Sequence, residues 1–213
     1  MRTMYIKKYF LALVIAISLL PAAALAQNND LEYGIKAGAN MSNLTGNDET
    51  YLYSSRIGYY GGLYVKKQLY GKFFLKPEFL YSLTGSAFRY KEDKEAGGLI
   101  NMTYASIPIM IQFDISDQLY IEAGPEINVN LSNKFKRTKD PNDNYATDPE
   151  TDWKSITSNI LAGFGFGAGY NIDNQLSANV RFITAVSRPF NYERANNISM
   201  LNIQLGLQYK LSK

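Results

Sequence analysis

Residues 198–211 read ISMLNIQLGLQYKL, and from Leu201 onward every second residue is apolar. The apolar set is Leu201, Ile203, Leu205, Leu207, Tyr209 and Leu211, and the intervening set is Asn202, Gln204, Gly206, Gln208 and Lys210. A period of two over this length is typical of a β-strand with one apolar and one polar face. The stretch therefore predicts a strand, and it gives the pattern to look for in the rest of the chain.

The same alternation recurs upstream. It predicts strands over residues 32–42, 57–67, 73–84, 99–113, 119–135, 155–170 and 176–186. The connections between them are alternately long and short, and Tyr70-Gly71-Lys72 in the second connection is a tight hairpin signal. With the final strand, the pattern predicts eight antiparallel strands.

The alternation alone leaves two architectures open. A soluble sandwich or a lipocalin-like barrel would bury the apolar face and would show the same period. Three features favour a membrane barrel. The strands reach the ~9–11 residues that a tilted strand needs to cross the bilayer, and short turns alternate with long loops. Aromatic residues of the apolar face lie at the short-turn ends, as in an interfacial girdle: Tyr33, Phe73, Phe113, Tyr170 and Tyr209. We therefore predict an all-β, eight-stranded antiparallel transmembrane β-barrel with short periplasmic turns and long extracellular loops.

The N-terminus has the layout of an export signal. Arg2, Lys7 and Lys8 precede an apolar core, and Ala24-Leu25-Ala26 provides a small-residue cleavage site. We expect residues 1–26 to be a cleaved signal peptide and residues 27–213 to be the outer-membrane barrel domain. The three cations of this segment account for the whole formal net charge of +3, so the mature chain is neutral and nothing indicates a nucleic-acid partner.

Two residue types that carry much of protein chemistry are missing from the sequence. Without Cys there are no disulfides or thiolate metal sites, and without His the commonest general base and metal ligand are lost. We expect no cofactor, no metal and no enzymatic activity. Asp140-x-Asn142-x-Asn144 begins like a calcium loop but lacks the later Gly and Glu, so we interpret it as a solvated acidic loop while a weak calcium site stays open.

The polar parity of the strands carries charges of both signs. We predict a lumen charge network of Glu32, Lys36, Lys66, Lys76, Glu78, Glu122, Glu126, Arg181 and Lys210. Glu78, Glu122 and Glu126 resemble catalytic carboxylates. However, side chains fill a small barrel, and buried charges there must pair, so we interpret the set as structural.

The longest loop, residues 136–153, is the predicted recognition element. Possible recognition residues in and beside it are Lys134, Lys136, Arg137, Lys139 and Trp153, the only Trp of the chain. The basic side chains suit lipopolysaccharide phosphates, and an exposed Trp is a common interface anchor. We expect outer-membrane lipid and lipopolysaccharide as partners, together with a protein partner that the sequence does not identify.

Several segments resemble known sequences. Gly206, Tyr209 and Leu211 of the final strand resemble the C-terminal signal by which the barrel-assembly machinery recognises outer-membrane barrels. GIKAGANMSNL (34–44), Pro77–Tyr81, ASIPIMIQF (105–113) and EAGPEI (122–127) resemble the PorT-like outer-membrane β-barrel proteins of the Bacteroidetes. That resemblance covers the mature chain and implies an outer-membrane barrel, and one branch of the family is tied to type IX secretion.

The predicted function is a structural or surface-interaction role through the long loops. An accessory role in secretion or envelope assembly is the alternative that the resemblance suggests. A small channel or an outer-membrane enzyme is the least favoured interpretation.

Overall fold

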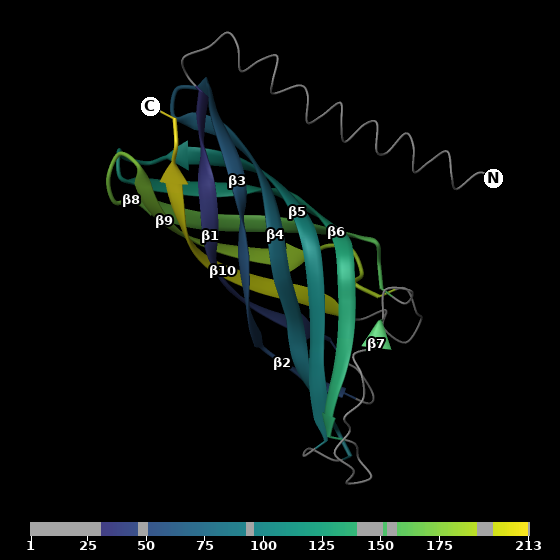
Figure 1. Ribbon diagram of the computed structural model, residues 1–213. Coiled ribbons are helices and arrows are strands. Elements are labelled where there is room, and N and C mark those ends of the chain that lie inside the picture. The colour runs from purple at the N-terminus through teal and green to yellow at the C-terminus, as the bar shows by residue number, and fades with distance from the viewer. Residues whose placement is uncertain are drawn as a thin grey trace, which may run out of the picture. The chain divides into compact units, whose positions relative to one another are not determined.

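The computed structural model describes residues 31–46, 51–92, 96–139, 151–152, 157–190 and 198–212. The chain divides into two units, Met1–Leu31 and Glu32–Lys213, and the second unit contains the barrel (Figure 1). The predicted signal peptide and its cleavage site lie outside the described residues, so that prediction stays open. Among the described residues, no helix is both long and apolar enough to cross a membrane.

Ten strands form one sheet. They are β1 (Leu31–Thr45), β2 (Tyr51–Ser54), β3 (Arg56–Tyr70), β4 (Phe73–Tyr90), β5 (Gly97–Asp114), β6 (Leu119–Lys139), β7 (Thr151–Asp152), β8 (Ile160–Asn171), β9 (Leu176–Ala185) and β10 (Ser199–Lys210). Eight of them close a ring in the order β4-β3-β1-β10-β9-β8-β6-β5, because β5 also pairs with β4. The short strands β2 and β7 pair with β4 and β6, on the same sides of those strands as β3 and β8. The predicted eight-stranded antiparallel barrel is confirmed.

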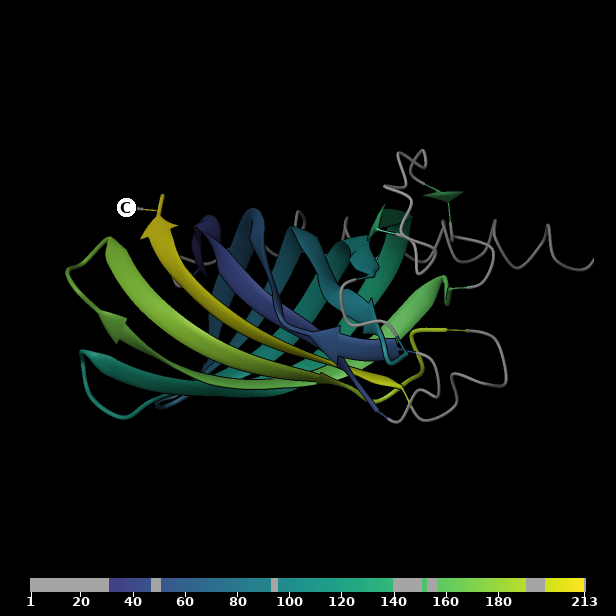
Figure 2. The ribbon, with the colours of Figure 1, turned by 90° about the horizontal axis from the view of Figure 1, so that it is seen from below.

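The ring closes between the two ends of the chain. β1 and β10 pair antiparallel without a break, from Gly34 opposite Lys210 to Thr45 opposite Ser199. β10 lies next to β1 and β9 on the curved wall (Figure 2). Closure leaves these two strands without an open edge, which a barrel in lipid requires.

The alternate apolar residues of each strand face outward from the barrel wall. On β10, Leu205 is 61% exposed while its neighbour Gln204 is 1% exposed, and Phe166 of β8 is 57% exposed. A soluble barrel would show the opposite arrangement. The exposed apolar faces of the strands together form the band expected of a protein that spans lipid.

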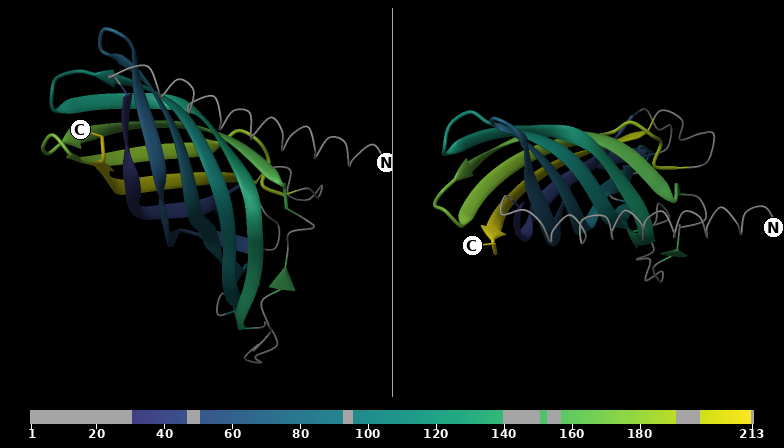
Figure 3. Two further views of the ribbon diagram at one scale, coloured as in Figure 1. Left: turned by 45° about the horizontal axis from the view of Figure 1, so that its top comes forward. Right: turned by 90° about the horizontal axis from the view of Figure 1, so that it is seen from above.

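The short turns lie at one end of the barrel, together with the end of β10 (Figure 3). Gly71 and Lys72 connect β3 to β4, and Gly71 adopts a φ of 54° that favours glycine. In the turn between β8 and β9, the backbone N–H groups of Gln175 and Leu176 donate to the carboxylate of Asp173, which holds the pKa of Asp173 below its ordinary value. The rings of Phe73 and Phe113, 4.9 Å apart, form part of the predicted girdle at this end.

Several predicted strand boundaries are wrong at the long-loop end. The predicted loop 85–98 contains the end of β4 and the start of β5, and β6 runs on to Lys139. The predicted loop 43–56 contains β2, whereas β8 begins at Ile160 and not at residue 155. Beyond the apolar band the outward face no longer meets lipid, so the sequence alternation stops while hydrogen bonding to the neighbouring strand continues.

Candidate functional site

An ion-pair cluster lies in the lumen. Arg181 of β9 donates from Nε and Nη2 to Oε1 of Glu122 on β6, at 2.8 and 2.6 Å. It also donates from Nη1 and Nη2 to the two oxygens of Glu78 on β4, at 2.8 and 2.7 Å. The side chains of all three are fully buried. One guanidinium therefore joins three strands across the interior by charge-assisted bonds.

Two lysines complete the ion-pair cluster. Lys36 of β1 donates to both oxygens of Glu78, at 3.2 and 3.3 Å. Lys76 of β4 lies 2.5 Å from Oε2 of Glu122 and donates to Gln208 of β10 at 3.3 Å. Three cations thus surround two carboxylates, and every charge has a partner of opposite sign, as burial demands.

Tyrosine rings border the ion-pair cluster. The ammonium of Lys76 lies 5.0 Å from the ring centroid of Tyr120, and that of Lys36 lies 5.8 Å from the ring of Tyr60. The hydroxyl of Tyr120 accepts a hydrogen bond from Gln208 at 2.6 Å. Aromatic faces attract such cations, so these rings add to the pairing of both lysines.

The long-loop half of the lumen contains a buried apolar cluster beside uncharged polar side chains such as Ser86, Asn133 and Thr157. Its buried cluster consists of Leu44, Phe88, Ile100, Met102, Tyr104, Phe135, Leu161, Phe190, Ile198 and Met200. Phe88 of β4 and Phe135 of β6 stack with centroids 4.8 Å apart. The prediction of a lumen filled by charges is therefore wrong for this half, because the inward-facing residues themselves become apolar along β5 and β10.

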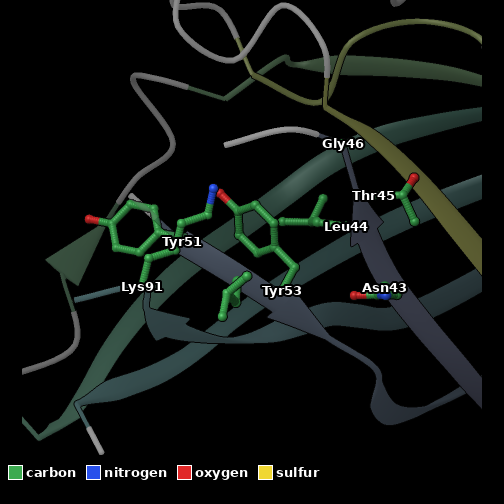
Figure 4. A pocket seen from close by; sticks show the side chains of 8 residues that line it. Asn43, Leu44, Thr45, Gly46, Tyr51, Tyr53 and Lys91 are labelled. Atoms are coloured by element: carbon green, nitrogen blue, oxygen red, sulfur yellow. The ribbon is translucent and has the colours of Figure 1, made fainter. Parts of the chain in front are cut away.

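A pocket lies at the long-loop end beside β2 (Figure 4). It has a volume of about 320 Å³ and is lined by Asn43, Leu44, Thr45, Gly46, Tyr51, Leu52, Tyr53 and Lys91. Tyr51 packs edge-on against Phe88, with centroids 5.2 Å apart, so the pocket wall rests on the apolar cluster of the lumen. Two tyrosines on β2 and a lysine just beyond the end of β4 can provide stacking surface and hydrogen-bond donors to a ligand outside the barrel.

The ring of strands, the outward apolar face and the filled lumen agree with a family match. The family described as outer membrane protein beta-barrel domain matches residues 25–191. The chain belongs to this outer-membrane barrel family. As a member, it is an integral outer-membrane protein, in agreement with its apolar outer surface.

Solved structures share the fold of this outer-membrane barrel. The chain is similar to Neisserial surface protein A, with 12% identity, a TM-score of 0.53, and coverage of 84% of this chain and 97% of that one. It is also similar to Ail, the attachment invasion locus protein of Yersinia pestis, with 13% identity, a TM-score of 0.47, and coverage of 85% and 99%. OprG of Pseudomonas aeruginosa follows with 10% identity, a TM-score of 0.45, and coverage of 85% and 96%. No match was found among curated proteins.

The predicted charge network divides into separate groups. Lys36, Lys76, Glu78, Glu122 and Arg181 form the ion-pair cluster described above. The other four predicted members lie apart from it. Glu32 and Lys210 are 3.9 Å apart and partly exposed, and Lys66 pairs with Asp114 at 3.5 Å.

Glu126 of β6 is also buried but does not join the ion-pair cluster. Within the described part of the chain, no basic side chain lies within ion-pair distance of it, and its Oε2 atom accepts no hydrogen bond. The prediction of one nine-membered network is therefore wrong. Parity gives the side on which a side chain lies but not its height in the lumen.

The predicted recognition residues are only partly described. Lys134 and Lys136 are exposed on β6, and Arg137 is half-buried. The side chain of Lys139, all of Trp153 and the acidic stretch Asp140–Asp148 lie outside the described residues. The recognition and calcium predictions for these positions stay open. Among the residues that are described, no group of three or more acidic side chains is placed to hold a metal ion.

Some residues of the predicted insertion signal make contacts within the barrel. Tyr209 is exposed on the outward face of β10, and the N–H of Leu211 donates to the carbonyl of Tyr33 at 2.9 Å. Gly206 faces the lumen, where a Cβ atom would lie 2.0 Å from the hydroxyl of Tyr60. Recognition by the assembly machinery stays a prediction.

Inward tyrosines over glycines are a feature that sequence reasoning missed. Tyr60 lies over Gly206, Tyr120 over Gly169, and Tyr64 over Gly34. The signal was present in the sequence, since these tyrosines and glycines all have the inward parity of their strands. A large ring in a narrow lumen needs a facing residue without a side chain.

Proposed function

We propose that this outer-membrane barrel is a non-enzymatic surface-interaction protein that recognises its partner at the long-loop end. The observation that carries the proposal is the filling of the lumen. The ion-pair cluster occupies one part of it, and the apolar cluster occupies the part toward the long loops. Among the described residues, side chains thus fill the interior, and Glu78 and Glu122 form no unpaired carboxylate dyad because both are bound to Arg181.

The long-loop end supplies what the lumen does not. The pocket beside β2 is built on strands and rests on a packed core, which suits recognition because a rigid scaffold holds the contact residues in place. In outer-membrane barrels the long loops face the outside of the cell. We therefore expect the partner to be an extracellular molecule or a neighbouring surface component, with lipopolysaccharide among the candidates.

An accessory role in secretion or envelope assembly is the second candidate. The segments that resemble PorT-like proteins of the Bacteroidetes lie on β1 and on the adjacent strands β4, β5 and β6. Three adjacent strands that all resemble the same family could form one contact surface for a partner on the barrel wall. The two candidates differ in where a protein partner would make contact.

Site-specific photo-crosslinking separates these candidates. A photoreactive residue replaces Leu52, which lines the pocket, or Ile109, which is exposed on the wall at β5. Surface recognition predicts a discrete adduct from position 52 in intact cells and none from position 109. Protein adducts from position 109 alone would favour the secretion role, and adducts from neither position would contradict both.

A further inference from the structure

A second hollow lies on the outward side of the barrel wall. It has a volume of about 370 Å³ and is lined by residues of β3, β4, β5 and β6. These are four consecutive strands of the ring (Figure 1). Arg56 of β3 and Lys134 of β6 come from the two outermost of these strands. Asn101, Thr103 and Ser132 add three polar side chains, and none of the lining residues is acidic. The cross-strand partner of Lys134 is Asp152 on β7, and Arg56 adds a second cation, so the lining supplies positive charge and donors that an anion can use.

Arg56 is held in place across β4. Its Nη1 atom donates to the carbonyl of Ile100 on β5, at 3.3 Å. Between them, Gly85 of β4 has no side chain, and a Cβ atom there would lie 1.9 Å from that same carbonyl oxygen. Gly85 also adopts a φ of 146°, which other residues rarely adopt. The wall thus contains a glycine at the point where Arg56 must reach the next strand.

The hollow lies at the level where the membrane's apolar band ends. On β5, the outward residues Phe113, Ile111, Ile109, Ile107 and Ala105 are apolar, and the next two are Thr103 and Asn101. About ten residues of strand, each rising about 3.3 Å and tilted by about 40°, span roughly 25 Å, which is the height of the apolar band of such barrels. Measured from the girdle at Phe113, the polar lining reaches the headgroup level of the outer leaflet.

The remaining lining residues face the lipid. Tyr81 and Leu131 are 48% and 45% exposed, and Leu83 is the third apolar residue that lines the hollow. An amphiphile requires an apolar border beside a cationic hollow, whereas a free ion does not require the apolar border.

We propose that this hollow binds the phosphate group of a lipid in the outer leaflet. Arg56 and Lys134 contact the phosphate, and Tyr81, Leu83 and Leu131 pack against its acyl chains. A phosphate suits this pair because the guanidinium fork and the ammonium both form charge-assisted bonds with its oxygens. The inference is independent of the partner proposed for the pocket beside β2.

Native mass spectrometry of the folded barrel with bis-phosphorylated lipid A tests the proposal. We expect the wild type to retain lipid A and the R56Q/K134Q variant to lose affinity by about tenfold or more, because two charge-assisted contacts are removed. The control is K67Q/K136Q, which removes the same charge from the same two strands outside the hollow, and it should bind as the wild type does. Removing the phosphates from the lipid should have the same effect as removing the cations. The affinity of the wild type for dephosphorylated lipid A should therefore be no higher than the affinity of R56Q/K134Q for lipid A.

Three results would overturn the proposal. One is equal loss in K67Q/K136Q, which would indicate general charge attraction. Another is undiminished binding by R56Q/K134Q. The third is competition by inorganic phosphate at the concentration of the lipid, which would indicate a site for a free anion. The heat-modifiable gel shift confirms that each variant is folded. If the double variant does not fold, K134Q alone replaces it, and unchanged binding by K134Q contradicts the inference.

Discussion

Arg181 is central to the lumen cluster, because its guanidinium donates four hydrogen bonds to the two carboxylates, which Lys76 approaches only as an ion pair, at 3.8 Å from Glu78 and 2.5 Å from Glu122. Each of its bonds to Glu78 and Glu122 is 2.8 Å or shorter, and neither carboxylate meets solvent. Lysine would not replace it, since an ammonium cannot provide a planar fork that meets both oxygens of Glu78 while also donating twice to Oε1 of Glu122.

Arg181→Met should destabilise the barrel by about 3–5 kcal/mol, because it leaves two buried carboxylates with only their lysine partners. Denaturant unfolding from lipid vesicles measures the change. Glu126→Gln is the matched control within the same lumen. It removes a buried carboxylate that has no cation beside it among the described residues, so stability should stay the same or rise. Equal losses in the two variants would contradict the role assigned to Arg181.

For single residues, the sequence predicts whether a side chain faces the lumen better than it predicts which other side chains it contacts there. The alternation of β4 and β6 places Lys76, Glu78 and Glu122 inside, and the structure confirms it. It does not show that Glu126, four residues from Glu122, lies beyond reach of Arg181. Height in the lumen depends on the stagger between strands, and that stagger is set by pairings distant in sequence.

At the scale of elements, the contact between β3 and β10 is made across β1. Tyr60 extends from β3 past β1 to Gly206 on β10, and its hydroxyl accepts no hydrogen bond from the described residues. The side chain of Tyr60 therefore contributes volume and contact area at this point, and a glycine is needed at position 206 of β10 to make room for it.

Gly206→Ala should destabilise the barrel by about 1–3 kcal/mol, because the added methyl group overlaps the Tyr60 hydroxyl. Tyr60→Phe alone should cost little, and it should recover part of the loss in the double variant, since the two positions touch. A double-mutant cycle by denaturant unfolding gives the coupling. Strict additivity would show that the two residues do not compete for the same space.

Strand existence was predictable, and strand length was not. All eight strands of the ring lie where period-two alternation occurs, because lipid on one side and packed side chains on the other impose it. β4, β5 and β6 continue to Tyr90, Gly97 and Lys139 without that pattern. Their extensions are held by pairing with each other, which leaves no mark in the sequence of a single strand.

At the scale of the whole molecule, we expect no steady ionic current through the barrel. The ion-pair cluster and the apolar cluster lie one above the other in the lumen, and open channels have about sixteen strands or more. Planar-bilayer recording of the purified protein checks this, with a sixteen-stranded porin as the positive control. A reproducible open level that disappears when a bulky side chain is placed in the lumen would refute the prediction.

The candidate site was predictable only in outline. Sequence reasoning placed recognition at the long-loop end, where the structure adds a pocket made by Tyr51, Tyr53 and Lys91. It did not find Arg56, because a single arginine at the start of a strand carries no pattern. Its relation to Lys134, 78 positions later in the sequence, exists only once β3 to β6 lie side by side.

The pairing of β1 with β10 also determines when the protein can be complete. Residues near position 34 bond to residues near position 210, so the seam forms only after the last strand has been made and exported. Until then β1 and β9 present unpaired edges, which attract other chains in water and cannot enter lipid. The hairpins β3–β4 and β8–β9 join near neighbours and can form early, whereas the seam has the highest loop-closure cost in the molecule. A premature stop before Ser199 would thus remove one strand and leave two edges, and the shortened chain would become a substrate for periplasmic proteases.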